Sequence, residues 1–119
     1  MNGKKILIVD DDKACCNLLS DYFIKHNYLV DIAYDGTKAK DLLDKNQYAY
    51  IIFDYSMPCF SGAALVKVIK EKNPKAKKIL ISGYDLVDEE IVNGMGVDAF
   101  LRKPFILEDL VAVLEKGQQ

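Results

Sequence analysis

Histidine, arginine and tryptophan are almost missing from this chain of 119 residues. His26 is the only histidine, Arg102 is the only arginine, and there is no tryptophan. A single histidine excludes a histidine-rich metal site and makes any Ser/His/Asp machinery depend on one residue. Because arginine is the commonest direct reader of guanine, we expect no direct binding of nucleic acid by this segment.

Cysteines are few, and long apolar runs are absent. The three cysteines are Cys15, Cys16 and Cys59, an odd number that includes an adjacent pair and no CxxC motif. This pattern predicts neither a disulfide framework nor a zinc site, and it favours the reducing cytoplasm. No apolar run approaches the ~18 residues of a membrane span, and the one that follows Met1–Lys5 is too short for a signal peptide. We expect a cytoplasmic chain with no membrane segment.

The counts that remain describe an ordinary globular domain. Half of the residues are hydrophobic, 29% are charged, and the formal net charge is -2. A chain of this length corresponds to one domain and can bury roughly two-thirds of its unfolded surface. We therefore expect a single domain over 1–119.

Short apolar runs alternate with helical patterns along the whole chain. Runs of strand length occupy 6–9, 29–33, 50–53, 79–81 and 99–101. Helical spacing of apolar residues follows each run, and in the first such segment it places Cys15 toward the core and Cys16 outward. Strands that are apolar on both faces and separated by helices predict an α/β fold with a parallel sheet covered on both sides. The apolar positions of the five expected helices are Cys15, Leu18, Leu19, Tyr22 and Phe23; Ala39, Leu42 and Leu43; Leu65, Val68 and Ile69; Val87, Ile91 and Met95; and Leu107, Leu110, Val111 and Leu114.

Polar and charged residues follow four of the five expected strands. The first strand ends in Asp10-Asp11-Asp12, the third in Asp54, the fourth in Ser82 and the fifth in Lys103. In a parallel α/β sheet the carboxyl ends of the strands line the crevice where ligands bind. The sequence therefore predicts that these side chains converge on one site.

A cluster of carboxylates at one edge of a sheet favours a hard divalent cation. Two unit charges ~4 Å apart cost about 4 kcal/mol at an effective dielectric constant of ~20. A cation removes that cost, and oxygen ligands without histidine or cysteine point first to Mg²⁺. Together with the Lys103 ammonium and the Ser82 hydroxyl, such an ion can hold the oxygens of a phosphoryl group, and an aspartate can accept that group as an acyl phosphate. The phosphate-binding signatures GxxxxGK[ST] and GxGxxG are missing, so we do not expect ATP or dinucleotide binding.

The same residues resemble the receiver domain of two-component response regulators. The resemblance covers roughly Lys4 to Lys116, which gives a single receiver domain over 1–119 with a core at about 4–116. It implies a flavodoxin-like, doubly wound (βα)5 fold, a three-layer sandwich with strand order 2-1-3-4-5. The matching motifs are Asp10-Asp11, Asp54, Met57-Pro58 with Gly62, Ser82, and Lys103-Pro104-Phe105.

The resemblance also implies a role for each matching residue. Asp54 would be the phosphoacceptor, and Ser82 and Lys103 would stabilise the phosphoryl group. Phe100 would be an aromatic switch that turns inward when Ser82 moves toward the phosphate. The metal, Mg²⁺ with Mn²⁺ as an alternative, would be held by Asp10, Asp11, Asp54 and the backbone carbonyl of Ser56, with Asp10 acting mainly through water. Loop support would come from Pro58, Gly62 and Pro104.

The implied function is a phosphorylation-controlled signalling switch rather than an enzyme with a separate substrate. The donor would be a phosphohistidine on a sensor histidine kinase or a histidine phosphotransfer protein. The response would be read by a downstream partner at the face formed by the fourth helix, the fifth strand and the fifth helix. The segment would be either a stand-alone regulator or a module of a larger response regulator or hybrid histidine kinase.

Two alternatives remain open from the residues alone. The DxD pattern of Asp10 and Asp12 is also similar to the start of haloacid-dehalogenase-like phosphatases, in which Asp10 would be the nucleophile and Asp12 the general acid. Against this, the chain is too short for a cap domain, and Ala14 stands where Thr or Val is usual. The second alternative is a flavodoxin-like or degenerate receiver that binds partners without phosphate, and the intact set of polar residues argues against it.

Overall fold

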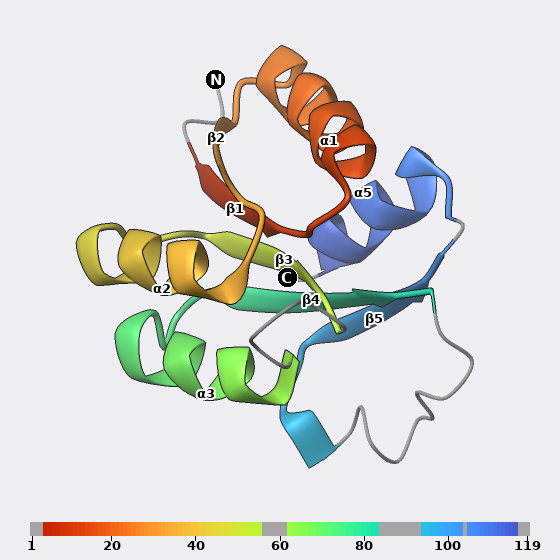
Figure 1. The fold of residues 1–119 in the computed structure, drawn as a ribbon. Helices are drawn as coiled ribbons and strands as arrows, with labels where there is room; N and C mark the ends of the chain where they lie inside the picture. The colour runs from red at the N-terminus through yellow and green to blue at the C-terminus, as the bar shows by residue number, and fades with distance from the viewer. Residues whose placement is uncertain (1–3, 56–61, 84–93, 104, 117–119) are drawn as a thin grey trace.

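The computed structural model of the chain describes residues 4–55, 62–83, 94–103 and 105–116. Its centre is a five-stranded sheet in the order β2-β1-β3-β4-β5, and every neighbouring pair of strands is parallel (Figure 1). This confirms the predicted doubly wound α/β fold and its strand order. The strands are β1 (Lys5–Val9), β2 (Leu29–Ala33), β3 (Tyr50–Asp54), β4 (Lys77–Ser82) and β5 (Ala99–Arg102).

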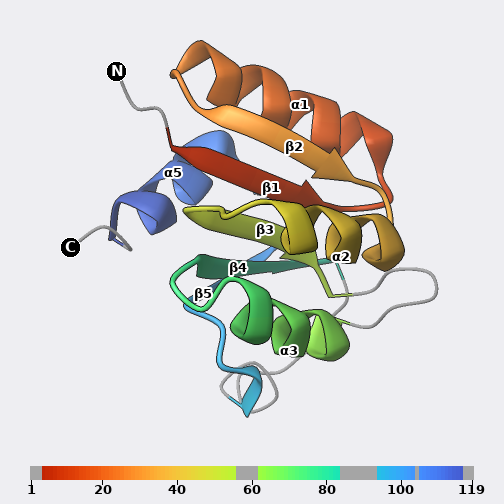
Figure 2. The same cartoon turned by 90° about the vertical axis from the view of Figure 1, so that its left-hand side faces the viewer.

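Helices cover both faces of this sheet. On one face lie α1 (Lys13–Lys25) and α5 (Leu107–Lys116), and on the other lie α2 (Gly36–Lys45) and α3 (Gly62–Lys72) (Figures 1 and 2). The predicted fourth helix falls mostly on 84–93, outside the described residues. None of the helices in the described part of the chain has the length and apolar character needed to cross a bilayer.

The side chains of the central strands explain why two apolar layers form. Along β1 and β3, successive side chains point to opposite faces, and both faces are buried. Leu7 and Phe53 pack toward α2 and α3, whereas Ile8 and Ile52 pack toward α1 and α5. Strands without a polar face are stable only when both sides are covered, so the alternation of strands and helices follows from the composition of the strands.

The buried face of α1 differs from the prediction. Asp12 caps the helix by accepting a hydrogen bond from the backbone N–H of Cys15 at 3.2 Å. Cys16 is fully buried, and its thiol donates to the carbonyl of Asp10 at 3.3 Å, while Cys15 is only partly buried and Leu18 is 60% exposed. The predicted placement of Cys15 inside and Cys16 outside was therefore wrong. The apolar stripe of α1 is wide enough that the helix could face the sheet in two rotational orientations. In the structure, the residues that face the sheet are Cys16, Leu19 and Phe23.

Candidate functional site

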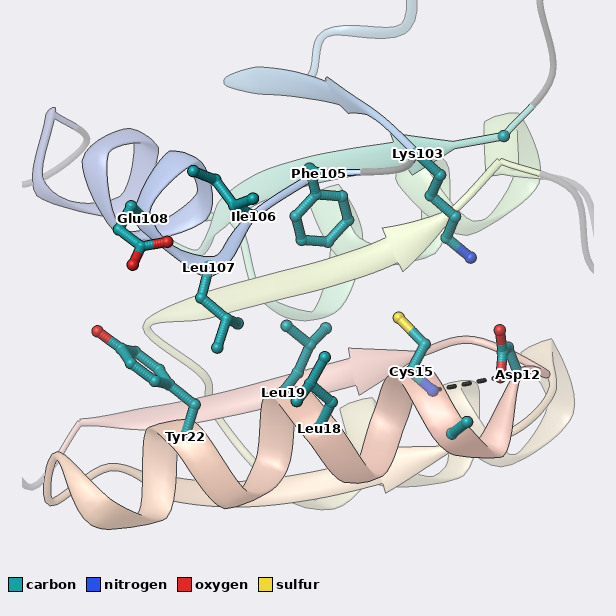
Figure 3. Close-up of a pocket in the computed structure, with 12 residues that line it drawn as sticks. Asp12, Cys15, Leu18, Leu19, Tyr22, Lys103, Phe105, Ile106, Leu107 and Glu108 are labelled. Atoms are coloured by element: carbon teal, nitrogen blue, oxygen red, sulfur yellow. Dashed lines mark hydrogen bonds between the residues drawn. The ribbon is translucent and has the colours of Figure 1, made fainter.

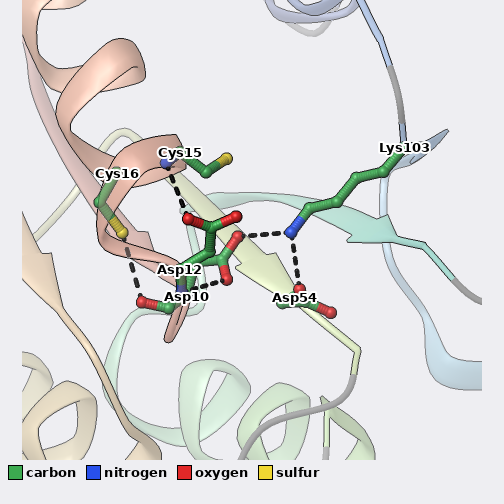
Figure 4. Close-up of polar contacts among 6 residues, drawn as sticks. All are labelled: Asp10, Asp12, Cys15, Cys16, Asp54 and Lys103. Atoms are coloured by element: carbon green, nitrogen blue, oxygen red, sulfur yellow. Dashed lines mark hydrogen bonds and ion pairs between the residues drawn. The ribbon is translucent and has the colours of Figure 1, made fainter.

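The polar residues predicted to converge lie at the carboxyl ends of the strands, and Figure 4 shows Asp10, Asp12, Asp54 and Lys103 close together there. Val9 pairs with Phe53, so Asp10, just beyond β1, and Asp54, the last residue of β3, lie side by side. Ser82 closes β4 and is 1% exposed. The backbone N–H of Lys103 donates to the carbonyl of Ser82 at 2.8 Å, which fixes Lys103 just beyond the end of β5.

The ammonium of Lys103 joins the two buried carboxylates. Its Nζ donates to Asp10 Oδ2 at 2.9 Å and to Asp54 Oδ2 at 2.9 Å (Figure 4). Asp10 is 0% exposed and Asp54 is 6% exposed, so both charges are largely removed from water. Burial disfavours the charged ammonium, but the hydrogen bonds that it donates to Asp10 and Asp54, together with their negative charges, outweigh that effect and raise the pKa of Lys103. Lys103 is therefore a fixed positive charge beside Asp54 at every physiological pH.

Two of these carboxylates belong to a cluster of three, whose chemistry fits a divalent metal ion. Asp10, Asp11 and Asp54 each offer an oxygen atom, and these atoms all lie within 4.8 Å of one another. Asp10 and Asp54 are buried and Asp11 is exposed, so the cluster has an open side. Three carboxylates and one ammonium leave a formal charge of -2, which a divalent cation neutralises. The all-oxygen donor set is the kind that Mg²⁺ and Ca²⁺ prefer.

Similarity to known proteins identifies the family. A family model described as the response regulator receiver domain matches residues 6–115. The chain belongs to this family. The matches support a receiver domain of two-component signalling, and they give no support to the phosphatase alternative.

Relatives of this receiver domain agree with it in sequence and in fold. Response regulator MprA of Mycobacterium sp. is 31% identical over 109 residues, which cover 91% of this chain and 47% of the relative. The receiver domain therefore spans about half of that relative's length. The receiver domain of Francisella response regulator 1452 is 29% identical with a TM-score of 0.84, covering 97% of this chain and 96% of that one. Response regulator TrrA from Thermotoga maritima, solved in complex with Mg(2+)-BeF, is 28% identical with a TM-score of 0.84, covering 96% and 98%.

The remaining predicted site residues are placed only in part. Phe100 lies half-buried on β5, and Gly62 is the first residue of α3. Ser56, Pro58 and Pro104 lie outside the described residues, so their predicted roles stay predictions.

Cys15 was predicted to be a core residue, with no role at the site. In the structure Cys15 lies near Asp10 and Lys103 (Figure 4). Burial, followed by the negative charge of Asp10, raises the pKa of its thiol to about 11. The Cys15 thiol is therefore uncharged at physiological pH, and it lies at the edge of the site. The location of Cys15 beside the site could be recognised only once the structure showed that α1 buries Cys16 instead.

A groove runs from Lys103 along the surface between α1 and the start of α5 (Figure 3). Its volume is about 710 Å³, and most of its lining is apolar. Leu18 on α1 is 60% exposed and Ile106 before α5 is 61% exposed, so both offer apolar surface to an incoming partner. Tyr22, Phe105 and Leu107 also line the groove. The sequence did not predict this groove, because it depends on how far apart the two helices pack.

Proposed function

We propose that this receiver domain accepts a phosphoryl group on Asp54 from a phosphohistidine of a sensor histidine kinase or a histidine phosphotransfer protein. The observation that carries the proposal is the Lys103 ammonium, which contacts Asp10 and Asp54 at 2.9 Å beside a cluster of three carboxylates. Its role is signalling, and its chemistry is confined to making and hydrolysing its own acyl phosphate. The free thiols of Cys15 and Cys16 support a cytoplasmic location.

In the proposed reaction, a carboxylate oxygen of Asp54 attacks phosphorus and forms an O–P bond while the P–N bond to the donor histidine breaks. The histidine nitrogen leaves with its electron pair, so no oxidant or further reactant is needed. Lys103 is already charged and in place, so it stabilises the negative charge on the phosphoryl oxygens without rearranging. Ser82, at the end of the neighbouring strand, would donate its hydroxyl to the phosphoryl group.

The carboxylates of Asp10, Asp11 and Asp54 would hold Mg²⁺, or Mn²⁺ as an alternative, together with the backbone carbonyl of Ser56. When bound, the ion would neutralise charge on the phosphoryl oxygens during transfer. The Mg(2+)-BeF complex of the Thermotoga relative supports this assignment, because beryllium fluoride resembles a phosphoryl group.

The phosphorylated domain would act through its surface. Movement of Ser82 toward the phosphoryl group would let Phe100 turn inward, and the face of the fourth helix, β5 and α5 would change shape. A downstream partner would bind this face in one state better than in the other.

Intact mass tests the proposal directly. After incubation with Mg²⁺ and acetyl phosphate, the chain should gain the mass of one phosphoryl group, and alkaline pH should remove it again, because acyl phosphates are labile to base. Chelation of Mg²⁺ should prevent the gain. No gain in mass, or a stable modification that maps to a residue other than Asp54, would contradict the proposal.

The groove beside Lys103 is where we propose that the donor protein docks. The groove begins at Lys103, which contacts Asp54, and the exposed apolar surface of Leu18 and Ile106 continues from there. Leu18→Asp should lower the rate of phosphoryl transfer from a phosphorylated kinase or phosphotransfer protein by at least about tenfold, because burying an unpaired charge at an interface costs more than ~1.4 kcal/mol.

Ile24→Asp is the matched control for this prediction. Ile24 lies on the same helix and is 56% exposed, close to the 60% of Leu18, but it does not line the groove. Both variants should take up phosphate from acetyl phosphate at the wild-type rate. Equal rates of transfer from the protein donor to the two variants would place the docking surface elsewhere.

A further inference from the structure

Arg102 lies over the aromatic ring of Phe100. The guanidinium carbon is 5.5 Å from the centroid of the ring, within the range of a cation–π interaction. The two residues are two positions apart on β5, so their side chains share one face of the sheet. Phe100 is half-buried and packs, as Met95 and Val97 do, against the core layer that includes Leu80, whereas Arg102 is exposed.

We propose that Arg102 is a positioning residue, which holds the Phe100 ring in its half-exposed orientation and so sets how readily the receiver domain switches. The inference rests on the proposed function, in which Phe100 turns inward after phosphorylation. It adds Arg102, on β5, to the residues that the proposed function uses.

The contact with Arg102 favours one orientation of the ring over the other. In water the guanidinium can lie over a half-exposed ring at little cost. To follow the ring into the core, the exposed guanidinium would have to lose its hydration, which is strongly unfavourable for a charged group. The inward orientation therefore forfeits the contact, and an interaction made in only one of two states shifts the equilibrium between them.

The pairing of β4 with β5 places this contact next to the phosphorylation site. Ser82 is paired with Arg102, and the N–H of Lys103 donates to the carbonyl of Ser82 at 2.8 Å. Leu80 is paired with Phe100 in the same ladder. A shift of Ser82 toward Asp54 therefore takes place beside the backbone that carries Arg102, and the ring lies two residues back along the same strand.

Arginine suits this role better than lysine. Its guanidinium is planar and less strongly hydrated than an ammonium, so it stacks on a ring more readily. For an exposed pair, the contact should change the ratio of the two ring orientations about two- to fivefold.

Incorporation of 4-fluorophenylalanine at position 100 provides a direct test. The ¹⁹F signal reports whether the ring is exposed, through its shift between H₂O and D₂O. In Arg102→Gln, we expect the population of the inward ring to rise two- to fivefold without any ligand. The midpoint of a titration with beryllium fluoride and Mg²⁺ should fall by the same factor, because less of its binding free energy is used to turn the ring.

Two further variants make the result specific. Arg102→Lys should lie between the wild type and Arg102→Gln, because it keeps the charge and loses the planar group. Lys40→Gln removes an exposed cation from α2 and should leave the ring and the midpoint unchanged. An unchanged ring signal and midpoint in Arg102→Gln, or a raised midpoint, would overturn the proposal.

The two proposals fail in different ways. If beryllium fluoride has no effect on any variant and the wild type gains no phosphoryl mass, the phosphoacceptor function is wrong, yet the ring populations without ligand still decide the role of Arg102. If the wild type is phosphorylated and all variants share one midpoint, only the role of Arg102 is wrong.

Discussion

Asp54→Asn is expected to lose all phosphoryl incorporation from acetyl phosphate and from any protein donor. An amide does not form an acyl phosphate, whereas its oxygen can still accept the hydrogen bond from Lys103. The side chain keeps its size in a position that is 6% exposed, so the fold should remain intact. Intact mass and circular dichroism of the same sample separate loss of chemistry from loss of structure.

Asp44→Asn is the matched control, because it makes the same chemical change at an exposed carboxylate that pairs with Lys72 on α3. It should incorporate phosphate as the wild type does. The comparison also separates a receiver from a phosphatase that uses Asp10, since such an enzyme would keep its turnover of phosphate esters after Asp54→Asn. Incorporation that persists in Asp54→Asn would mean that another residue accepts the phosphoryl group.

Most of the fold could be predicted because its causes are local in the sequence. Strands such as β3 are apolar at every position before Asp54, and strands of that kind require helices on both faces. The convergence of Asp10, Asp54, Ser82 and Lys103 follows from the parallel direction of the strands, which brings all carboxyl ends to one edge. The strand order, by contrast, came from the resemblance to receiver domains.

Features that depend on packing between elements could not be predicted. The apolar stripe of α1 allowed two registers, and only contact with the sheet chose Cys16 over Cys15. The groove beside Leu18 depends on the distance between α1 and α5, which no pattern within either helix encodes. The two hydrogen bonds of Lys103 to Asp10 and Asp54 also depend on packing. The positions of these residues in the sequence predicted that they lie close together, but not which atoms are bonded.

Lys103→Met should destabilise the receiver domain strongly when no divalent cation is present. The methionine keeps an apolar stem but leaves the carboxylates of Asp10 and Asp54 without their common partner, and both are buried. Removing one partner of a buried ion pair costs about 3–5 kcal/mol, and the lower end applies here because the Lys103 side chain is 25% exposed. Urea unfolding in EDTA measures the loss.

Added Mg²⁺ should recover part of that stability, because it neutralises the same carboxylates from the side of Asp11. Lys13→Met is the control: Lys13 is exposed, and its ammonium lies 5.5 Å from the centre of the Tyr34 ring.

The pH dependence of stability follows from the raised pKa of Lys103. The stabilising contribution of Lys103 should be fully present below its unfolded pKa of ~10.4 and should be lost as pH rises through its folded pKa. The wild type and Lys103→Met should therefore differ by a constant amount from pH 7 to 9. Equal stabilities of Lys103→Met and Lys13→Met in EDTA would show that the paired carboxylates do not depend on this cation.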